Sequence, residues 1–493
     1  MGTNYGLRST GLLVFVGRIV SAFTGLLFTV MVARWLDPAG FGTWEVIVTL
    51  VTFSAYPVGV VAYWATRDVA RGRMVGTTAL ICGILLSCLG LVMYLGFAFV
   101  TYSRIVSSVL PFLLGALLVP LSYWSGVSNS LVQGYRPGAY SYALVTSELA
   151  KLFTAYEALY VYRLGIEGVI VALLAAYFVQ SAIGTYFVRR TVSEGFDMPQ
   201  AKRWSRLAWL PAISYLPGVI AVADTFVAAT GFGTAIVGYY QVAFIVASVV
   251  GYSSGLAFSL YPMLLRGGDE RLPAISMEFA LLFAIPMAAG GVALAGPILF
   301  LFGAKWLPGA MGLAILSAMF VFTTISGILD QTLLGTERAD VGDRPNFHAL
   351  LRSNLIFVPV ANILFGVTYV SSLYVALDYA FTHGLPTSST VALWGSVQFA
   401  ATFAFLVVKA LRARRYARLV PGMSVVYYLL AAAAMAVVLY LVSGLVAPEV
   451  GGTVSYGAHL LVVAILGAVV YFGAVYAMDG KTRDMAHSLL RRI

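Results

Sequence analysis

The chain has 493 residues, of which 60% are hydrophobic and only 10% are charged, and its formal net charge is +10. Soluble globular proteins carry about 25% charged residues, so water is not the main solvent of this chain. The basic residues lie at the boundaries of apolar segments and form no patch interleaved with aromatic residues. This arrangement argues against nucleic-acid binding and favours orientation in a membrane with contacts to lipid headgroups.

Apolar segments of about 20 residues, the length that crosses the hydrocarbon core of a bilayer, recur along the whole chain. The first runs from Thr10 to Ala33 and is longer than the ~7–15 apolar residues of a signal peptide, so we interpret it as an uncleaved span. Fourteen spans are expected, and they begin near Thr10, Phe41, Val75, Ile105, Ala139, Gly165, Leu207, Ile236, Ala274, Gly309, Arg352, Pro386, Gly422 and Tyr456.

Basic residues predict the orientation of these spans. Of the 30 Lys and Arg residues, 24 fall in alternate gaps, among them a run that begins at Lys409. Basic residues near a span are retained on the cytoplasmic side, so both termini are expected in the cytoplasm. Two cations, Arg18 and Lys151, fall inside spans instead. We therefore predict an all-α, multi-pass protein of the cytoplasmic membrane.

Internal repetition predicts how the spans are grouped. Phe41-Gly42-Thr43 at the start of the second span resembles Val237-Gly238-Tyr239 at the start of the eighth, and Ser125-Gly126-Val127 resembles Ser326-Gly327-Ile328 at nearly the same separation. Parallel repeats of this kind place a transporter's substrate site at their interface. The expected domains are a six-helix lobe (1–190), a cytoplasmic linker (191–206), a second six-helix lobe (207–418), and two additional helices with a cytoplasmic tail (419–493).

Charged side chains inside spans normally face a bundle interior or a wet cavity. Arg18 lies roughly 9 Å from the inner boundary at 1.5 Å per residue; its planar guanidinium suits a phosphate group, or it extends to the inner surface. Glu148 and Lys151 are three residues apart on one helical face. Either they neutralise each other, or Lys151 binds a substrate phosphate and Glu148 tunes the strength of that binding.

Asp224 is a candidate site for proton or sodium coupling, because it has no obvious partner within its span. The alternative is a protonated carboxyl group that is hydrogen-bonded to a neighbouring span. Asn129, Asp330 and Glu45 are further candidates for a polar cavity or gate. Asn129 and Asp330 occupy equivalent positions of the repeat and could instead cap their helices near the membrane surface, and Glu45 lies close enough to an outer end to be partly solvated.

The sequence contains no catalytic constellation and no phosphate-binding glycine pattern. Its four histidines share no metal-ligand spacing, and its gaps are too short for a soluble domain. We therefore expect a transporter rather than an enzyme, without a cofactor or a metal site.

Several segments are similar to a known family. The segment that joins the first two spans reads Ala33-Arg34-Trp35-Leu36-Asp37-Pro38-Ala39-Gly40-Phe41-Gly42-Thr43-Trp44. It resembles the first loop of Wzx-type oligosaccharide flippases, which belong to the multidrug/oligosaccharidyl-lipid/polysaccharide exporter superfamily. Further segments resemble that family in the same order along the chain: Arg67-Asp68-Val69-Ala70-Arg71-Gly72, Gln133-Gly134-Tyr135-Arg136-Pro137, Asp224 followed by Val237-Gly238-Tyr239-Tyr240, and Leu334-Gly335-Thr336-Glu337-Arg338-Ala339-Asp340.

The resemblance implies translocation of a polyprenyl-phosphate- or diphosphate-linked oligosaccharide from the inner to the outer leaflet. The lobes of such flippases alternate between inward-open and outward-open forms around a cationic cavity, in which Arg18 and Lys151 would lie. Implied partners are the lipid-linked oligosaccharide, membrane lipids, and the glycosyltransferases or polymerase of the same pathway. The alternatives are a cation-coupled multidrug exporter of the same superfamily and a polytopic membrane glycosyltransferase or ligase, which would need a larger outer loop with catalytic residues.

Overall fold

A computed structural model of the protein describes residues 20–104, 108–136, 138–192, 195–257, 260–265, 269–337, 352–415, 422–444 and 452–484. These parts of the chain consist of helices joined by short turns and loops, and they contain no strand. Eleven of the described helices are long and apolar enough to cross a membrane, or twelve if the bent pair α2–α3 counts as one span. The protein is therefore an all-α, multi-pass membrane protein, and the expected count of fourteen spans stays a prediction.

The chain packs as two compact units, residues 1–238 and 239–493. This boundary lies within α11 (Thr234–Ser248), whereas the sequence predicts that the lobes divide at the linker 191–206. The six-helix lobes stay a prediction. The described helices of unit 1 are Val20–Trp35, α2 (Pro38–Ala55), α3 (Val58–Ala70), α4 (Gly76–Tyr102), α5 (Val109–Tyr135), α6 (Ala139–Tyr156), a π-helical turn η1 (Glu157–Val161), α7 (Ile166–Phe187), a short 3₁₀ helix η2 (Arg189–Val192), α8 (Met198–Arg206), α9 (Trp209–Ala221), α10 (Ala223–Phe232) and the first turn of α11 (Thr234–Ser248).

The family-like first loop builds the start of α2. The carboxylate of Asp37 caps the helix by accepting a hydrogen bond from the amide of Gly40 at 3.0 Å, and Pro38 occupies the first helical position, where its missing N–H costs nothing. After Ala55 the helix bends by 57° into α3. The hydroxyl of Tyr123 donates a 2.7 Å hydrogen bond to the carbonyl of Ser54 at this bend, so a neighbouring helix satisfies the interrupted backbone.

The two glycines that match in the sequence repeat lie against each other within unit 1. A Cβ atom added to Gly42 of α2 would collide with the carbonyl of Thr234, and one added to Gly238 of α11 would collide with the carbonyl of Pro38. Each glycine thus lies on a backbone carbonyl located four residues before the other glycine. Only residues without a side chain allow two helices to approach this closely.

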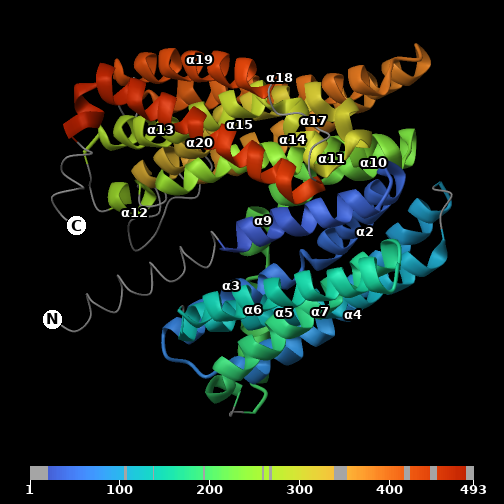
Figure 1. Ribbon diagram of the computed structural model, residues 1–493. Coiled ribbons are helices and arrows are strands. Elements are labelled where there is room, and N and C mark those ends of the chain that lie inside the picture. Colours follow the sequence, from blue (N-terminus) through green and yellow to red (C-terminus); the bar gives the residue numbers. More distant parts are fainter. Residues whose placement is uncertain are drawn as a thin grey trace. The chain divides into compact units, whose positions relative to one another are not determined.

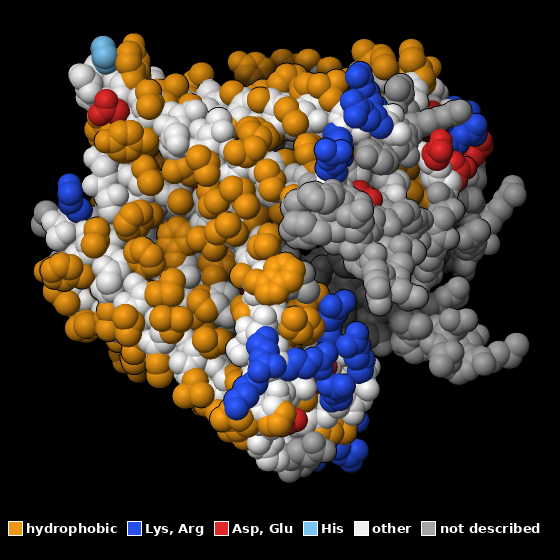
Figure 2. Space-filling view, turned by 180° about the vertical axis from the view of Figure 1, so that it is seen from behind, with side chains coloured by type: hydrophobic (Ala, Val, Ile, Leu, Met, Phe, Trp, Pro, Cys, Tyr) orange, Lys and Arg blue, Asp and Glu red, His pale blue; other side chains and the backbone are white. Residues whose placement is uncertain are grey.

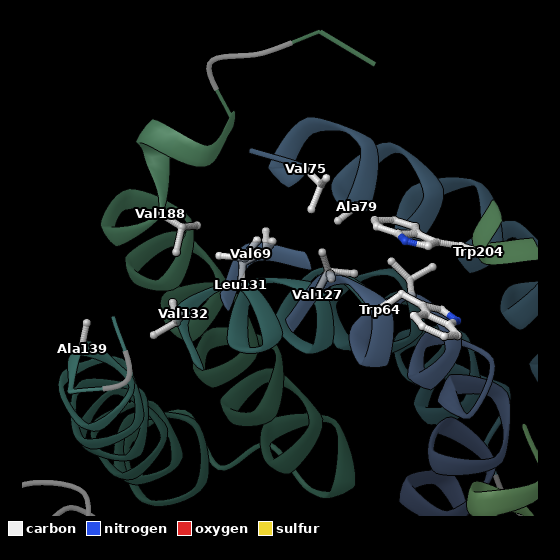
Figure 3. Packing of buried hydrophobic residues seen from close by; sticks show 12 residues of the cluster. Trp64, Val69, Val75, Ala79, Val127, Leu131, Val132, Ala139, Val188 and Trp204 are labelled. Carbon is white, nitrogen blue, oxygen red and sulfur yellow. The ribbon is translucent and has the colours of Figure 1, made fainter. Parts of the chain in front are cut away.

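Unit 1 has an apolar core at the end that carries Arg136, Arg189 and Arg190, which we call its basic end. Twelve buried residues form this core: Val61, Trp64, Ala65, Val69, Val75, Ala79, Val127, Leu131, Val132, Ala139, Val188 and Trp204. They come from α3, α4, α5, α6, α8 and the segments that adjoin them, and Figure 3 shows Trp204 beside Trp64 at one side of the cluster. Packing in this core holds together the ends of the helices that carry the basic residues of the basic end.

The predicted linker contains the amphipathic helix α8, which is docked onto unit 1. Its buried face carries Gln200 and Trp204, whose side-chain N–H groups both donate to the carboxylate of Asp68, Trp204 at 2.9 Å. Asp68, at the end of α3, is fully buried, and the guanidinium groups of Arg73 and Arg203 lie 3.7 Å from it. Trp204 is therefore part of the protein core.

Unit 2 consists of the rest of α11 followed by η3 (Val249–Ala257), α12 (Leu260–Leu265), α13 (Leu272–Ala293), α14 (Ala295–Phe302), η4 (Ala304–Gly309), α15 (Ala310–Thr336), α17 (Asn354–Thr382), α18 (Thr387–Ala413), α19 (Ser424–Ser443) and α20 (Gly452–Met478). Figure 1 shows α19 and α20 alongside α13, and the contacts between these helices agree. The hydroxyl of Tyr471 in α20 donates a 2.9 Å hydrogen bond to the carbonyl of Leu282 in α13. The two C-terminal helices are thus an integral part of unit 2.

Much of the molecular surface suits a lipid environment. Figure 2 shows hydrophobic side chains over much of the face in view, with most of the visible Lys and Arg side chains in groups towards one side of it. Large apolar side chains such as Phe99, Leu441 and Val469 are more than half exposed. A soluble monomer rarely exposes contiguous apolar surface of this extent, and this surface agrees with the composition of the chain.

Candidate functional site

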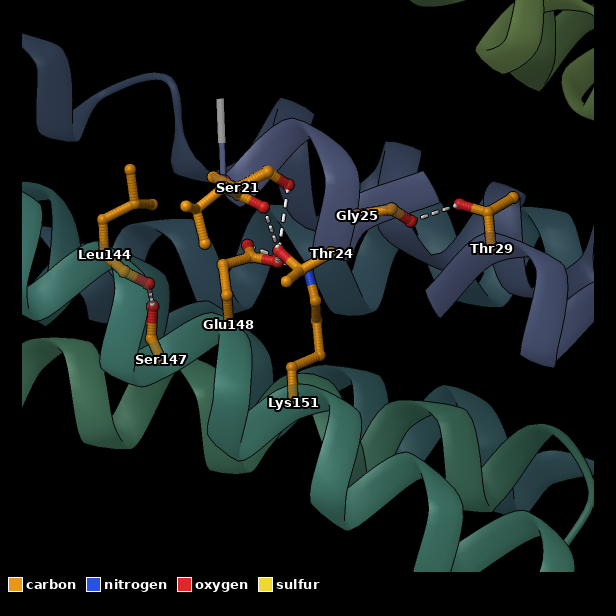
Figure 4. A network of polar contacts seen from close by, with 9 residues as sticks. Ser21, Thr24, Gly25, Thr29, Leu144, Ser147, Glu148 and Lys151 are labelled. Carbon is orange, nitrogen blue, oxygen red and sulfur yellow. Dashed lines mark hydrogen bonds and ion pairs between the residues drawn. The ribbon is translucent and has the colours of Figure 1, made fainter. Parts of the chain in front are cut away.

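The predicted pair of charges in α6 is present and contacts the first described helix. Glu148 and Lys151 are one helical turn apart, and the Lys151 ammonium lies 2.9 Å and 2.8 Å from the two carboxylate oxygens of Glu148. The hydroxyl of Thr24 donates to Oε2 of Glu148 at 3.0 Å from the helix Val20–Trp35. Figure 4 shows the Lys151 side chain rising from α6 towards Thr24 beside Glu148. The sequence predicts the pair but not the contribution of Thr24.

An aromatic ring also lies beside the ammonium group. The Lys151 nitrogen lies 5.1 Å from the centre of the Phe28 ring, within the range of a cation–π interaction, and Phe28 in turn packs edge-on against Trp44 of α2. The side chains of Glu148 and Lys151 are each only 13% exposed. An ammonium group has three N–H donors, and the two oxygens of Glu148 account for two of them. This arrangement can hold a cation at a partly dry position while leaving a donor for an anionic group.

The remaining unit 1 candidates occupy different surroundings. Arg18 lies outside the described residues. Asp224 is buried in the first turn of α10, directly after the break at Val222, and its Oδ1 accepts hydrogen bonds from the amide of Thr225 at 2.6 Å and from the Thr225 hydroxyl at 3.2 Å. Glu45 is half-buried in α2. The structure does not bring Asp224 or Glu45 into hydrogen-bond or ion-pair contact with Lys151 within its described part.

Asn129 belongs to a polar network between α5 and α7. Its amide donates to the Ser125 hydroxyl at 3.3 Å, and that hydroxyl donates to Gln180 at 3.0 Å. One turn along, Ser128 and Trp124 both contact the hydroxyl of Thr185 at 2.9 Å. Asn129 does not act as a simple helix cap, because it lies inside α5 and its bond runs to another side chain.

Asp330 belongs to a charged version of this network in unit 2. The ammonium of Lys409 in α18 donates to Asp330 at 2.8 Å, to Asn362 of α17 at 2.8 Å and to Ser326 at 2.9 Å. Ser326 and Asp330 are the repeat equivalents of Ser125 and Asn129. In each unit, this serine hydrogen-bonds to a polar side chain from a helix packed alongside, Gln180 in unit 1 and Lys409 in unit 2.

Lys409 corrects the assignment made from the charge pattern. Its place in a basic run predicts a cytoplasmic loop, but α18 continues to Ala413 and the Lys409 side chain is only 5% exposed. The spacing along the helix could have shown that Lys409 is not a loop residue, because Lys409 lies almost a full helical turn before the next cation, Arg412. Lys409 therefore lies inside a span rather than in a loop, as the sequence predicts for Arg18 and Lys151.

Comparisons with known proteins were made at the levels of sequence and structure. No protein-family model matches the sequence, and no curated protein matches it. Among solved structures, the lipid II flippase MurJ in an inward closed conformation superposes with a TM-score of 0.64 at 12% identity, covering 95% of this chain and 99% of that chain. A mutant form of a MATE protein gives a TM-score of 0.51 at 15% identity, covering 83% of this chain and 96% of that chain.

A multidrug resistance MATE family transporter of the MOP superfamily in an outward-facing conformation gives a TM-score of 0.50 at 14% identity, covering 83% of this chain and 96% of that chain. These identities are too low to carry over a substrate, but the similarity to MurJ extends over almost all of both chains, and the similarity to the MATE structures extends over most of this chain. The protein therefore has the fold that the MurJ flippase and the MATE transporters share.

Proposed function

We propose that the protein is a flippase that translocates a polyprenyl-phosphate- or diphosphate-linked oligosaccharide from the inner to the outer leaflet of the cytoplasmic membrane. The observation that carries the proposal is Lys151, a cation in a predicted membrane-spanning helix whose side chain is largely buried beside Glu148. A cation at such a position is costly, and its pairing with Glu148 leaves it able to donate to an additional anionic group. The fold shared with a lipid II flippase over nearly the full length supports the same function.

In this mechanism the substrate's phosphate approaches Lys151, and Arg18 adds a second positive charge from the first span. The phosphate oxygens compete with Glu148 for the ammonium, so the carboxylate sets how tightly the headgroup is held and allows its release. The lipid tail stays in the bilayer, and the two halves of the protein expose the site to each side in turn. Asp224 is the candidate for coupling this cycle to a proton or sodium ion.

A cation-coupled multidrug exporter is the second candidate, favoured by the structural similarity to MATE transporters. In that case Glu148 and Asp224 would bind a cationic substrate, and Lys151 would weaken that binding. The two functions predict opposite responses to the removal of Lys151: headgroup translocation is lost in the flippase, whereas export of cations persists or improves in the drug exporter.

The deciding experiment uses the double variant Glu148→Gln/Lys151→Met. Removing both charges leaves no unpaired buried ion, so the variant should fold. Wild-type and variant proteins are reconstituted in liposomes with a fluorescent polyprenyl-diphosphate-linked sugar, and a membrane-impermeant reductant reports which leaflet holds the fluorophore. We expect translocation to fall by about tenfold or more, since a charge-assisted hydrogen bond contributes about 1.5–3 kcal/mol.

Lys202→Gln is the matched control, because it removes an exposed positive charge from the same unit. It should translocate the substrate like the wild type. If the double variant is as stable as the wild type and equally active, Glu148 and Lys151 form a purely structural pair and the proposed binding role is wrong. Transport of a fluorescent organic cation, measured in the same liposomes, distinguishes the multidrug exporter.

A further inference from the structure

A second cationic site lies at the basic end of unit 1, where α5 and α7 end. There the structure contains a cavity of about 240 Å³, room for roughly eight water molecules. Its walls come from the last residues of α5, the last residues of α7 and the short helix η2. The lining residues are Tyr135, Arg136, Tyr186, Phe187, Arg189 and Arg190. Half of them are arginines and the other half are aromatic.

Two of the guanidinium groups are held by aromatic rings. Arg189 lies 4.9 Å from the centre of the Tyr186 ring, and Arg136 lies 5.9 Å from that of Tyr135. Stacking on a ring leaves the N–H groups at the edge of the guanidinium plane free to bind an anion. The aromatic residues thus orient the donors without neutralising them.

The backbone that carries Arg189 and Arg190 is also fixed. The Thr77 hydroxyl of α4 donates to the carbonyl of Val192 at 2.8 Å, and the Thr191 hydroxyl donates to the carbonyl of Val188 at 2.8 Å. Gly76 lies so close to Thr191 that an added Cβ would approach its backbone to 2.6 Å. Because η2 is anchored to α4 in this way, the arginines are presented from a rigid turn rather than from a loose loop.

None of the described residues that line the cavity carries a carboxylate, and neither Arg136 nor Arg189 forms an ion pair with a described acidic residue. Part of the positive charge complements the carbonyl ends of α5 and α7. A helix end contributes only about half a charge, however, so two such ends compensate only about one of the two positive charges of Arg136 and Arg189. The remaining positive charge favours the binding of an anion.

The position of the cavity indicates where the anion comes from. Tyr186, in the lining of the cavity, is 60% exposed. Tyr142 of α6 and Phe178 of α7 are also more than half exposed. Exposed apolar and aromatic side chains next to basic residues are typical of the level of lipid headgroups. Arginine binds phosphate through two parallel N–H groups, and the phosphate of an anionic lipid lies at this level.

We propose that this cavity binds the phosphate group of an anionic membrane phospholipid. The site is distinct from Lys151, which lies within α6, and the inference does not depend on the transported substrate. A lipid bound there joins the ends of α5 and α7 to the headgroup layer and fixes the depth of unit 1 in the membrane. The negatively charged surface of the cytoplasmic leaflet attracts basic groups by about 1 kcal/mol each, and the placement of Arg136 and Arg189 in one cavity turns this general attraction into a defined site.

The test is native mass spectrometry of the delipidated full-length protein with added phosphatidylglycerol or phosphatidylcholine. For the wild type, we expect the first phosphatidylglycerol molecule to bind about tenfold more tightly than phosphatidylcholine. The variant Arg136→Gln/Arg189→Gln/Arg190→Gln should lose this preference. All three side chains are exposed, so the variant should fold, which a melting temperature measured in phosphatidylcholine verifies.

The control variant Arg71→Gln/Lys202→Gln/Arg206→Gln removes the same number of exposed positive charges from unit 1 outside the cavity. It should keep the preference for the first phosphatidylglycerol molecule. An equal loss in both variants would show diffuse attraction and overturn the site. The assignment to a lipid also fails if inorganic phosphate alone raises the melting temperature of the wild type as much as phosphatidylglycerol does.

Discussion

Lys409 and Asp330 form an ion pair inside the helices of unit 2, and each charge depends on the other for its stability there. The ammonium is surrounded by oxygen atoms of Ser326, Asp330 and Asn362 at 2.8–2.9 Å. Oδ1 of Asp330 is buried and has no hydrogen-bond partner among the described residues. The carboxylate therefore relies on Lys409 for most of its compensation.

Replacing Lys409 with Met is expected to destabilise unit 2 strongly, because it leaves an uncompensated buried carboxylate. Breaking a buried pair in this way costs about 3–5 kcal/mol, whereas replacing both partners by neutral groups is often close to neutral. The double variant Asp330→Asn/Lys409→Met should therefore be more stable than Lys409→Met alone. Thermal unfolding of the purified protein in detergent measures both. Equal melting temperatures for the two variants would contradict a mutual dependence of the charges.

Single residues also show how far the sequence could predict the candidate site. Glu148 and Lys151 were predictable, because their spacing within one apolar helix is a local property. Thr24 and Phe28 were not, since they reach Glu148 and Lys151, respectively, from a helix more than a hundred residues earlier. The buried position of Lys409 was also missed. A charge count groups Lys409 with the basic residues that follow it in the sequence, and it does not show that Asp330 and Asn362 lie next to it in the folded protein.

At the level of helices, proline breaks are compensated by tyrosine hydroxyl groups from neighbouring helices. Pro286 lies inside α13 and has no N–H group to donate to the carbonyl four residues earlier, which is that of Leu282. The hydroxyl of Tyr471 donates to this carbonyl at 2.9 Å. Tyr471 is fully buried, so this hydrogen bond replaces the missing bond of the helix in a place without water.

Tyr471→Phe is expected to lower the stability of unit 2 by about 1–3 kcal/mol, the cost of an unsatisfied buried polar group. Pro286→Ala restores the backbone donor, so the loss caused by Tyr471→Phe should be smaller in the Pro286→Ala background. A double-mutant cycle of unfolding free energies measures this coupling. Additive effects of the two substitutions would show that the hydroxyl does not serve the carbonyl freed by the proline.

At the scale of the whole molecule, the chain passes from unit 1 to unit 2 within α11, directly after its contact with α2. The contact joins Gly42 and Gly238, which the sequence repeat pairs with each other. The first turn of α11 is thereby fixed on unit 1 before the helix continues into unit 2. Close backbone packing at this point joins α11 to α2.

Gly238→Ala is expected to force α2 and α11 apart, because the new methyl group would overlap the carbonyl of Pro38. Overpacking of this kind costs about 1–3 kcal/mol, so the melting temperature and the rate of translocation should both fall. Gly96→Ala is the matched control, since a Cβ at Gly96 in α4 meets no atom within 4 Å and alanine favours a helix. An equally small effect of both substitutions would exclude close packing at Gly238.

The amino-acid sequence by itself determined that the protein is a helical membrane protein, where most of its spans lie and which polar groups they carry. Hydrophobicity and charge are properties of each segment alone, and the bilayer selects on them directly. Only the tertiary structure decided the surroundings of these groups: Asp68 holding α8, Lys409 inside unit 2 and Tyr471 on the proline break of α13. Each of these contacts joins segments that are distant in sequence, and its free energy exists only once the helices have packed.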